Sequence, residues 1–163
     1  MKKSTVIIVG IMTSFLILVT WFYFSAKDGF TVAEREAIDR ALQESTLTEV
    51  DHVEFFAGAT NYTVLFGNNI DGEKLLVWVG DEEEEIHEEK ASEGVSKSTI
   101  RKQVVERQGA VTFVHITPGK LGELWIWEVF YKKKENDGVR HYYDFYNFAD
   151  GEWLDTYTLS LED

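Results

Sequence analysis

The sequence predicts an α+β protein in which an N-terminal transmembrane helix is followed by two units, each a helix and an antiparallel sheet. Two observations support this prediction. Residues Ser4 to Ala26 contain no Asp, Glu, Lys or Arg and are mostly large and apolar. The chain after this segment twice shows one helical pattern followed by three or four strand-like runs, with a period of roughly 65 residues. Because one short helix covers only one face of a sheet, we expect the two units to pack together.

The apolar segment from Ser4 to Ala26 has the length of a membrane anchor. At about 1.5 Å per residue, a helix of this length crosses a hydrocarbon core of roughly 30 Å. The block Trp21-Phe22-Tyr23-Phe24 ends the segment with rings that favour the membrane–water interface. A cleaved signal peptide is the alternative, but it would need small residues where this bulky block stands. Lys2 and Lys3 predict that residues 1–3 are cytoplasmic and that residues after Ala26 are extracytoplasmic.

The chain is strongly acidic. It has 16 Lys and Arg residues against 29 Asp and Glu residues, a net charge of −13 at pH 7. Lys2 and Lys3 are the only charged residues before Lys27, so the extracytoplasmic portion is more acidic still. Such a surface repels nucleic acid, and nucleic-acid binding is therefore excluded. The absence of cysteine agrees with an exterior location.

Residues 27–80 are expected to form the first unit. Its helix begins near Thr31, because Thr31 and Glu34 have the spacing of a capping box. Apolar residues then recur at helical spacing: Ala33, Ala37, Ile38, Ala41 and Leu42. Three strand-like runs follow at 50–57, 61–66 and 74–79. Asn, Asp and Gly residues at 68–72 predict a turn between the last two strands.

Residues 81–95 read as an acidic connector and residues 96–163 as the second unit. The second helix is expected to begin after Ser96 and to end at Gly109. Strand-like runs follow at 111–117, 124–131, 140–146 and 153–159. Turns between them are predicted at Pro118-Gly119, at 136–138 and at Asp150-Gly151.

The sequence shows no pattern typical of a catalytic or ligand-binding centre. The stretch from His87 to Ala91 begins like a zinc-protease motif but lacks the second histidine. Cysteine is absent, as are a nucleophile elbow and a glycine-rich phosphate loop. We therefore predict no enzyme activity, no cofactor, no metal site and no small-molecule substrate. Glu128 and Asp144, on neighbouring predicted strands, are the carboxylate pair that a cell-wall hydrolase could use, and this function stays as a less favoured alternative.

Aromatic residues on the second unit indicate a partner-binding surface. Its strands are apolar on both faces, and a helix covers only one of them, so the other face meets either the first unit or a partner. Trp127 is expected in the core. The candidate partner-binding residues are Trp125, Tyr142, Tyr146 and Trp153, and the last three of these are expected to lie nearer the surface.

Four stretches of the sequence together resemble a known family. In chain order they are Val77-Trp78-Val79, Glu93-Gly94-Val95-Ser96, Trp127-Glu128-Val129 and Tyr143-Asp144-Phe145. With the membrane anchor before them, they resemble the YpmB-like (TseB) proteins of Gram-positive bacilli. These are single-pass membrane proteins whose outer portion is two PepSY-like (cystatin-like) units. The final hairpin departs from the family pattern, since residues 146–149 stand before Asp150-Gly151 where a Thr-Gly turn is usual, and its register stays open.

The resemblance implies a non-enzymatic regulator of cell-wall elongation. Such a protein would act by contact with a penicillin-binding transpeptidase or another envelope protein. PepSY units also occur in protease propeptides, so a protease-modulating module is the alternative that the resemblance leaves open.

Overall fold

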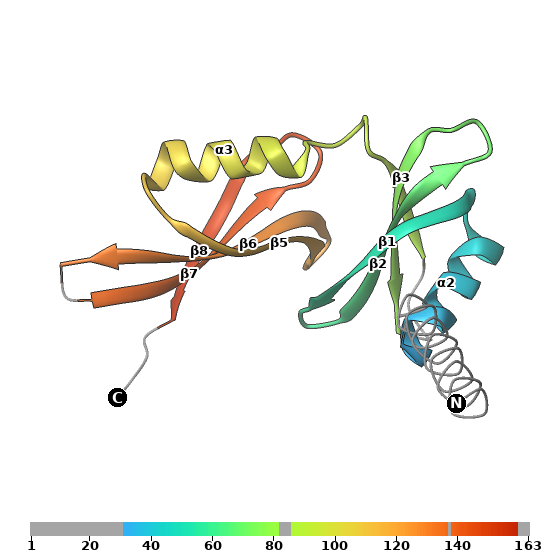
Figure 1. Cartoon of the computed structure of the whole chain (residues 1–163), viewed down its shortest axis with the longest axis horizontal. Helices are drawn as coiled ribbons and strands as arrows, with labels where there is room; N and C mark the ends of the chain where they lie inside the picture. The colour runs from blue at the N-terminus through green and yellow to red at the C-terminus, as the bar shows by residue number, and fades with distance from the viewer. Residues whose placement is uncertain (1–30, 82–85, 137, 160–163) are drawn as a thin grey trace, which may run out of the picture. The chain divides into compact units, whose positions relative to one another are not determined.

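The computed structural model describes residues 31–81, 86–136 and 138–159 (Figure 1). The predicted cytoplasmic tail (1–3) and transmembrane helix (4–26) lie outside the described residues. Within the described ranges, neither helix is long and apolar enough to cross a membrane. By its internal contacts the chain divides into two parts, residues 1–35 and 36–163. Both sheets and the cores described below belong to the part from residue 36 to residue 163.

The first sheet has four antiparallel strands and one covering helix. Helix α2 (Val32–Glu44) precedes β1 (Leu47–Ala57), β2 (Asn61–Asn69), β3 (Lys74–Gly80) and β4 (His87–Lys90), paired in the order β1-β2-β3-β4. The predicted capping box is confirmed, because the Thr31 amide donates to Glu34 Oε2 at 2.6 Å and the Glu34 amide to Thr31 Oγ1 at 3.3 Å. One buried cluster joins the helix to the sheet: Ala37, Ala41, Leu47, Leu65, Leu75, Val77 and Val79. The small side chains of Ala37 and Ala41 let α2 lie close to the strands.

Strand β4 lies where the sequence predicts an acidic connector, and this part of the prediction is wrong. Residues 87–90 pair with β3, from Trp78 opposite His87 to Leu75 opposite Lys90. The strand carries charged side chains without apolar alternation, so it gives no strand signal. Backbone hydrogen bonds to β3 define it instead, and Lys90 Nζ adds an ion pair to Glu73 Oε1 at 2.9 Å.

The second sheet repeats the helix-then-sheet order. Helix α3 (Lys97–Gln108) precedes β5 (Thr112–Leu121), β6 (Leu124–Glu135), β7 (Gly138–Asn147) and β8 (Trp153–Leu159), paired antiparallel in the order β5-β6-β7-β8. Figure 1 shows α3 lying along one face of this sheet. The predicted helix ends are confirmed: Ser96 Oγ accepts from the Thr99 amide at 3.2 Å, and Gly109 ends the helix with a φ of 76°. The α+β class and the two helix-plus-antiparallel-sheet units are confirmed.

The predicted Pro118-Gly119 turn is wrong. Both residues lie inside β5, with Pro118 opposite Trp127 and Gly119 opposite Ile126. Because β5 is an edge strand, the missing amide hydrogen of proline leaves no partner strand unsatisfied. The chain turns instead around Gly122, whose φ of 58° favours glycine.

The two sheets share one hydrophobic core. Its buried residues come from both sheets and from α3: Phe56, Tyr62, Val64, Leu76, Trp78, Ile100, Val104, Ile116, Ile126, Trp127, Val129, Tyr131, Phe145, Tyr146 and Phe148. The Phe148 ring centre lies 5.1 Å from that of Trp78 and 5.9 Å from that of Trp127. Trp127 is buried, as expected, and its Nε1 donates to the Val95 carbonyl at 2.8 Å.

Two glycines permit this packing. A Cβ on Gly94 would lie 2.3 Å from Cε1 of Phe148, and a Cβ on Gly119 would lie 2.3 Å from Cδ2 of Phe56. Real Cβ atoms do not approach rings so closely. Both positions therefore need glycine for close approach of the backbone to an aromatic ring.

Replacing Gly94 by Ala should lower the free energy of unfolding by about 1–3 kcal/mol, because the added methyl forces the Phe148 ring to move. The Phe148→Leu variant removes the ring atoms that the methyl meets, so Gly94→Ala should cost less in the Phe148→Leu background. Urea unfolding of the two single variants and the double variant measures this coupling. An equal cost of Gly94→Ala in both backgrounds would contradict the predicted contact.

Candidate functional site

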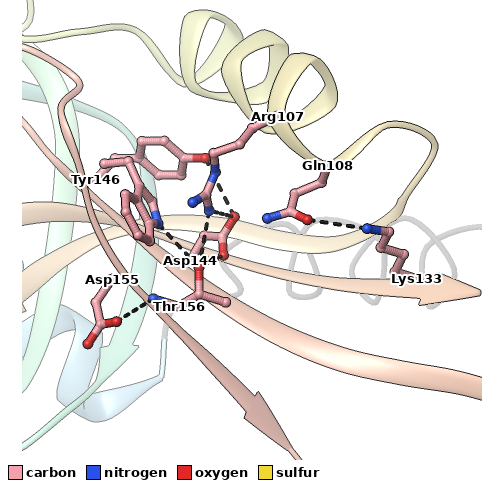
Figure 2. Close-up of polar contacts among 8 residues, drawn as sticks. Arg107, Gln108, Lys133, Asp144, Tyr146, Asp155 and Thr156 are labelled. Atoms are coloured by element: carbon pink, nitrogen blue, oxygen red, sulfur yellow. Dashed lines mark hydrogen bonds and ion pairs between the residues drawn. The ribbon is translucent and has the colours of Figure 1, made fainter. Parts of the chain in front are cut away.

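A buried carboxylate connects helix α3 to the second sheet. Asp144, in the middle of β7, is fully buried. Its Oδ2 accepts a hydrogen bond from Arg107 Nη2 at 2.6 Å, and its Oδ1 accepts from Thr156 Oγ1 at 2.6 Å (Figure 2). Arg107 lies in the last turn of α3 and Thr156 in β8. One carboxylate therefore holds the helix and the edge strand against the middle of the sheet.

Trp153 lies at the outer side of this network. The Arg107 guanidinium lies over the Trp153 ring, with its carbon 4.3 Å from the ring centre. Arg107 Nη2 also donates to Thr156 Oγ1 at 3.1 Å, and Trp153 Nε1 donates to the same oxygen at 3.2 Å. The Trp153 side chain is nevertheless 45% exposed. It is thus held in place by the network while part of its surface faces solvent.

The network also suppresses ionisation of its tyrosines. Burial raises the pKa of Tyr131 and of Tyr146, and the negative charge of Asp144 raises both further. A tyrosinate at either position would lose hydration and face a like charge. Tyr146 Oη makes a long hydrogen bond to Asp144 Oδ2 at 3.5 Å. Both phenols therefore stay neutral at physiological pH and serve the packing of the sheet against α3.

The predicted partner-binding residues lie in different surroundings. Trp125 is half-buried where the sheets meet, stacked on His87 at 4.1 Å and tilted against Trp78 at 5.2 Å. Tyr142 is half-buried, and its Oη donates to Glu135 Oε1 at 3.1 Å.

Tyr146 is 1% exposed, so the expectation that it lies near the surface is wrong. It lies opposite Trp127 in the β6–β7 pairing, on the sheet face that α3 covers. Trp153 lies at the surface, as expected. Partner binding by Trp125, Tyr142 or Trp153 stays a prediction, and Tyr146 has no accessible surface to offer a partner.

Glu128 and Asp144 do not form a catalytic pair. Asp144 lies opposite Val129, whereas Glu128 lies opposite Phe145. Since side chains alternate along strands, the two carboxylates point to opposite faces of the sheet. Glu128 Oε1 is instead 3.0 Å from His115 Nε2. The hydrolase alternative therefore loses the residues on which it depended.

The sheet face opposite α3 carries stacked rings. Phe130 and Tyr143 stack with ring centres 4.4 Å apart, and His115 and His141 lie 5.3 and 5.8 Å from Phe130. These four side chains are exposed or half-buried. Towards the first sheet the same face is buried, at Ile126 and Gly119. The expectation that the second apolar face meets the first unit therefore holds at one end of the sheet.

Arg107 is a site residue that the sequence pattern does not single out, although it carries a signal. It follows the buried Ile100 and Val104 at a spacing of seven and three residues, which places it on the buried side of α3. Asp144 stands among the aromatic residues of β7. A charged residue on the buried side of a helix and another on a buried strand indicate an ion pair. Only the tertiary structure shows that Arg107 and Asp144 contact each other.

Comparisons with known proteins agree on one family. A family model described as the cell wall elongation regulator TseB-like domain matches residues 36–80. A Bacillus subtilis (strain 168) protein, "Probable cell wall elongation regulator TseB", is 32% identical over 151 residues, which is 88% of this chain and 92% of that protein. The solved structure of the YpmB protein from Bacillus subtilis matches with a TM-score of 0.69 at 27% identity, covering 80% of this chain and 100% of that one.

The Arg107→Met variant should lose about 3–5 kcal/mol of unfolding free energy, because it leaves the Asp144 carboxylate buried without its cation. Asp144→Asn should cost less, since the Arg107 side chain is 30% exposed and can reach water. Urea unfolding measures both variants.

Lys97→Met is the matched control for Arg107→Met. It removes a cation whose pair with Glu54 has side chains 43% and 20% exposed, and should cost about 0–1 kcal/mol. Equal losses of unfolding free energy from Arg107→Met and Lys97→Met would show that the buried ion pair stabilises the fold no more than the exposed one.

Proposed function

The chain belongs to the TseB-like family of cell wall elongation regulators, and on this basis we propose that it is a single-pass membrane protein that regulates wall elongation from outside the cytoplasm. It would act by contact with a penicillin-binding transpeptidase. The observation that carries the proposal is the 32% identity to the Bacillus subtilis regulator over 88% of the chain. The likeness thus includes both sheets and extends well beyond the matched residues 36–80.

Membrane anchoring is supported by the uncharged run from Ser4 to Ala26 with its aromatic end. An anchor confines the folded part to the membrane surface, where a membrane-bound partner is also confined. This raises the effective concentration of one protein near the other, so a weak contact is enough.

Action by protein contact rather than by catalysis is supported by the state of the carboxylates. The Asp144 carboxylate accepts hydrogen bonds from Arg107 and Thr156, and the Glu128 side chain points to the opposite face of the sheet. Exposed and half-exposed rings, among them Trp153 and Tyr157, are suited to a protein interface. The acidic residues, which give the whole chain a net charge of −13, would steer the domain towards a basic surface and make association sensitive to salt.

In-cell cross-linking of the tagged full chain tests the proposed partner. We expect recovery of a wall-synthesising transpeptidase, at a level above that obtained with an unrelated single-pass protein of similar abundance. The same experiment with the anchor replaced by a cleaved signal should recover much less, because the effective concentration falls. If only abundant envelope proteins are captured in all three samples, the transpeptidase contact is refuted.

Protease added to wall-stripped cells tests the topology. The portion after Lys27 should be digested, whereas a tag fused before Lys2 should stay intact in the cytoplasm. Mass spectrometry of the mature N-terminus distinguishes the alternatives, because a chain that begins near Ala26 would reveal a cleaved signal. Full protection of the folded part in intact, wall-stripped cells would reverse the proposed orientation.

A further inference from the structure

Helix α3 is basic, although the chain as a whole is acidic. Its 12 residues include four cations against one carboxylate, that of Glu106, whereas the chain has a net charge of −13. Two of the cations, Lys97 and Arg107, form ion pairs with carboxylates of β1 and β7. The other two, Arg101 and Lys102, are exposed, and among the residues that the structure describes neither forms an ion pair. These two cations are therefore available to a ligand.

An aromatic ring holds the guanidinium of Arg101 in place. The guanidinium carbon lies 4.2 Å from the centre of the Phe113 ring, which belongs to the edge strand β5. Contact with a ring uses no hydrogen-bond acceptor, so the N–H groups of Arg101 keep their capacity to donate. A planar cation with several such donors matches a carboxylate, which accepts two parallel hydrogen bonds. Arg101 is thus oriented in advance for a carboxylate ligand.

Apolar side chains lie beside these cations. Val105 follows Arg101 by one helical turn and is 45% exposed, and Phe113 is half-buried. Figure 1 shows the second sheet on one side of α3 only. We call Arg101, Lys102, Val105 and Phe113 together the α3 surface. Contact with apolar groups of a ligand would remove more of Val105 and Phe113 from water, which favours binding.

The charge and the spacing of the α3 surface define the chemistry of its occupant. Cations without an acidic partner favour a ligand that carries carboxylates. The apolar side chains beside them favour a protein segment over an anionic polymer that has no apolar groups. Because residues one turn apart lie on the same side of a helix, a partner helix can present both kinds of group at matching spacing. A second copy of α3 would bring cations together, which disfavours self-pairing through this surface.

We propose that the α3 surface binds an amphipathic helix of a partner protein that carries carboxylates and apolar side chains one turn apart. One carboxylate would accept both hydrogen bonds from Arg101, and another would pair with Lys102. Apolar side chains of the partner would cover Val105 and Phe113. This docking surface goes beyond the proposed function, in which the acidic residues steer the domain towards a basic partner. With both surfaces the domain can contact two proteins of opposite charge.

Nuclear magnetic resonance of the isotope-labelled full chain in zwitterionic micelles tests this inference with three stapled helical peptides as long as α3, 12 residues. One has Glu and Leu one turn apart on one side, one has Gln in place of Glu, and one has Ala in place of Leu. The Glu–Leu peptide should bind and shift the amide signals of residues 98–106 and of Phe113. The other two should bind about tenfold more weakly, because one lacks the charge and the other the apolar contact.

Variants of the α3 surface complete the test. Arg101→Lys keeps the charge but loses the planar arrangement of donors, so it should weaken binding of the Glu–Leu peptide about three- to tenfold. Lys102→Gln should also weaken binding, because it removes one ion pair with the peptide. Lys74→Gln, the same change at an exposed position of β3 in the first sheet, should leave binding unchanged.

Several results would overturn the inference. Among them are absence of binding, equal binding of the Gln or the Ala peptide, and signal shifts confined to other parts of the chain. Unchanged binding by Arg101→Lys would show that only diffuse charge attracts the peptide. Signal shifts of α3 that depend on protein concentration without peptide would make a second copy of the chain the occupant. Because the test needs no transpeptidase, its result does not depend on the partner in the proposed function.

Discussion

The ring of Phe148 joins the two sheets, and the rest of the fold depends on this contact. It packs against Trp78 of the first sheet and Trp127 of the second. Its amide donates to the Trp125 carbonyl at 2.9 Å, and its carbonyl accepts from the Val95 amide at 2.8 Å. Each sheet has one helix and two apolar faces, so neither can bury its second face alone. Packing of these large rings against each other buries part of the second apolar face of both sheets.

The pair of Arg107 and Asp144 has a different role. Burying an ion pair costs desolvation that its attraction does not always repay, so it is weak evidence for added stability. It does define geometry, because the carboxylate accepts only donors placed correctly around it. Helix α3 and strand β8 both supply such donors. The polar network therefore positions an edge strand that the apolar core by itself would leave less well fixed.

The residues that reveal the family are mostly structural. Trp78, Trp127 and Asp144 are buried, and Gly94 lies against Phe148. Three of these residues, Trp78, Trp127 and Gly94, lie around the ring of Phe148, where the two sheets meet. Contact with a partner has to use other residues, because a buried side chain cannot reach it. Among the described residues, exposed rings such as Trp153 and Tyr157 are accessible to a partner.

The sequence by itself determined what local periodicity and local hydrogen bonding control. The α+β class, the caps at Thr31 and Ser96 and most strands were predictable because helices and strands differ in the spacing of their apolar residues. Strand β4 was not, since it exists by pairing with β3 and carries no alternation of its own. Tyr146 shows the other limit. Alternation assigns the residues of a strand to two faces, but only the tertiary structure decides which face α3 covers. The reason is that contacts between α3 and the sheet join residues far apart in sequence, such as Arg107 and Asp144, which are 37 positions apart.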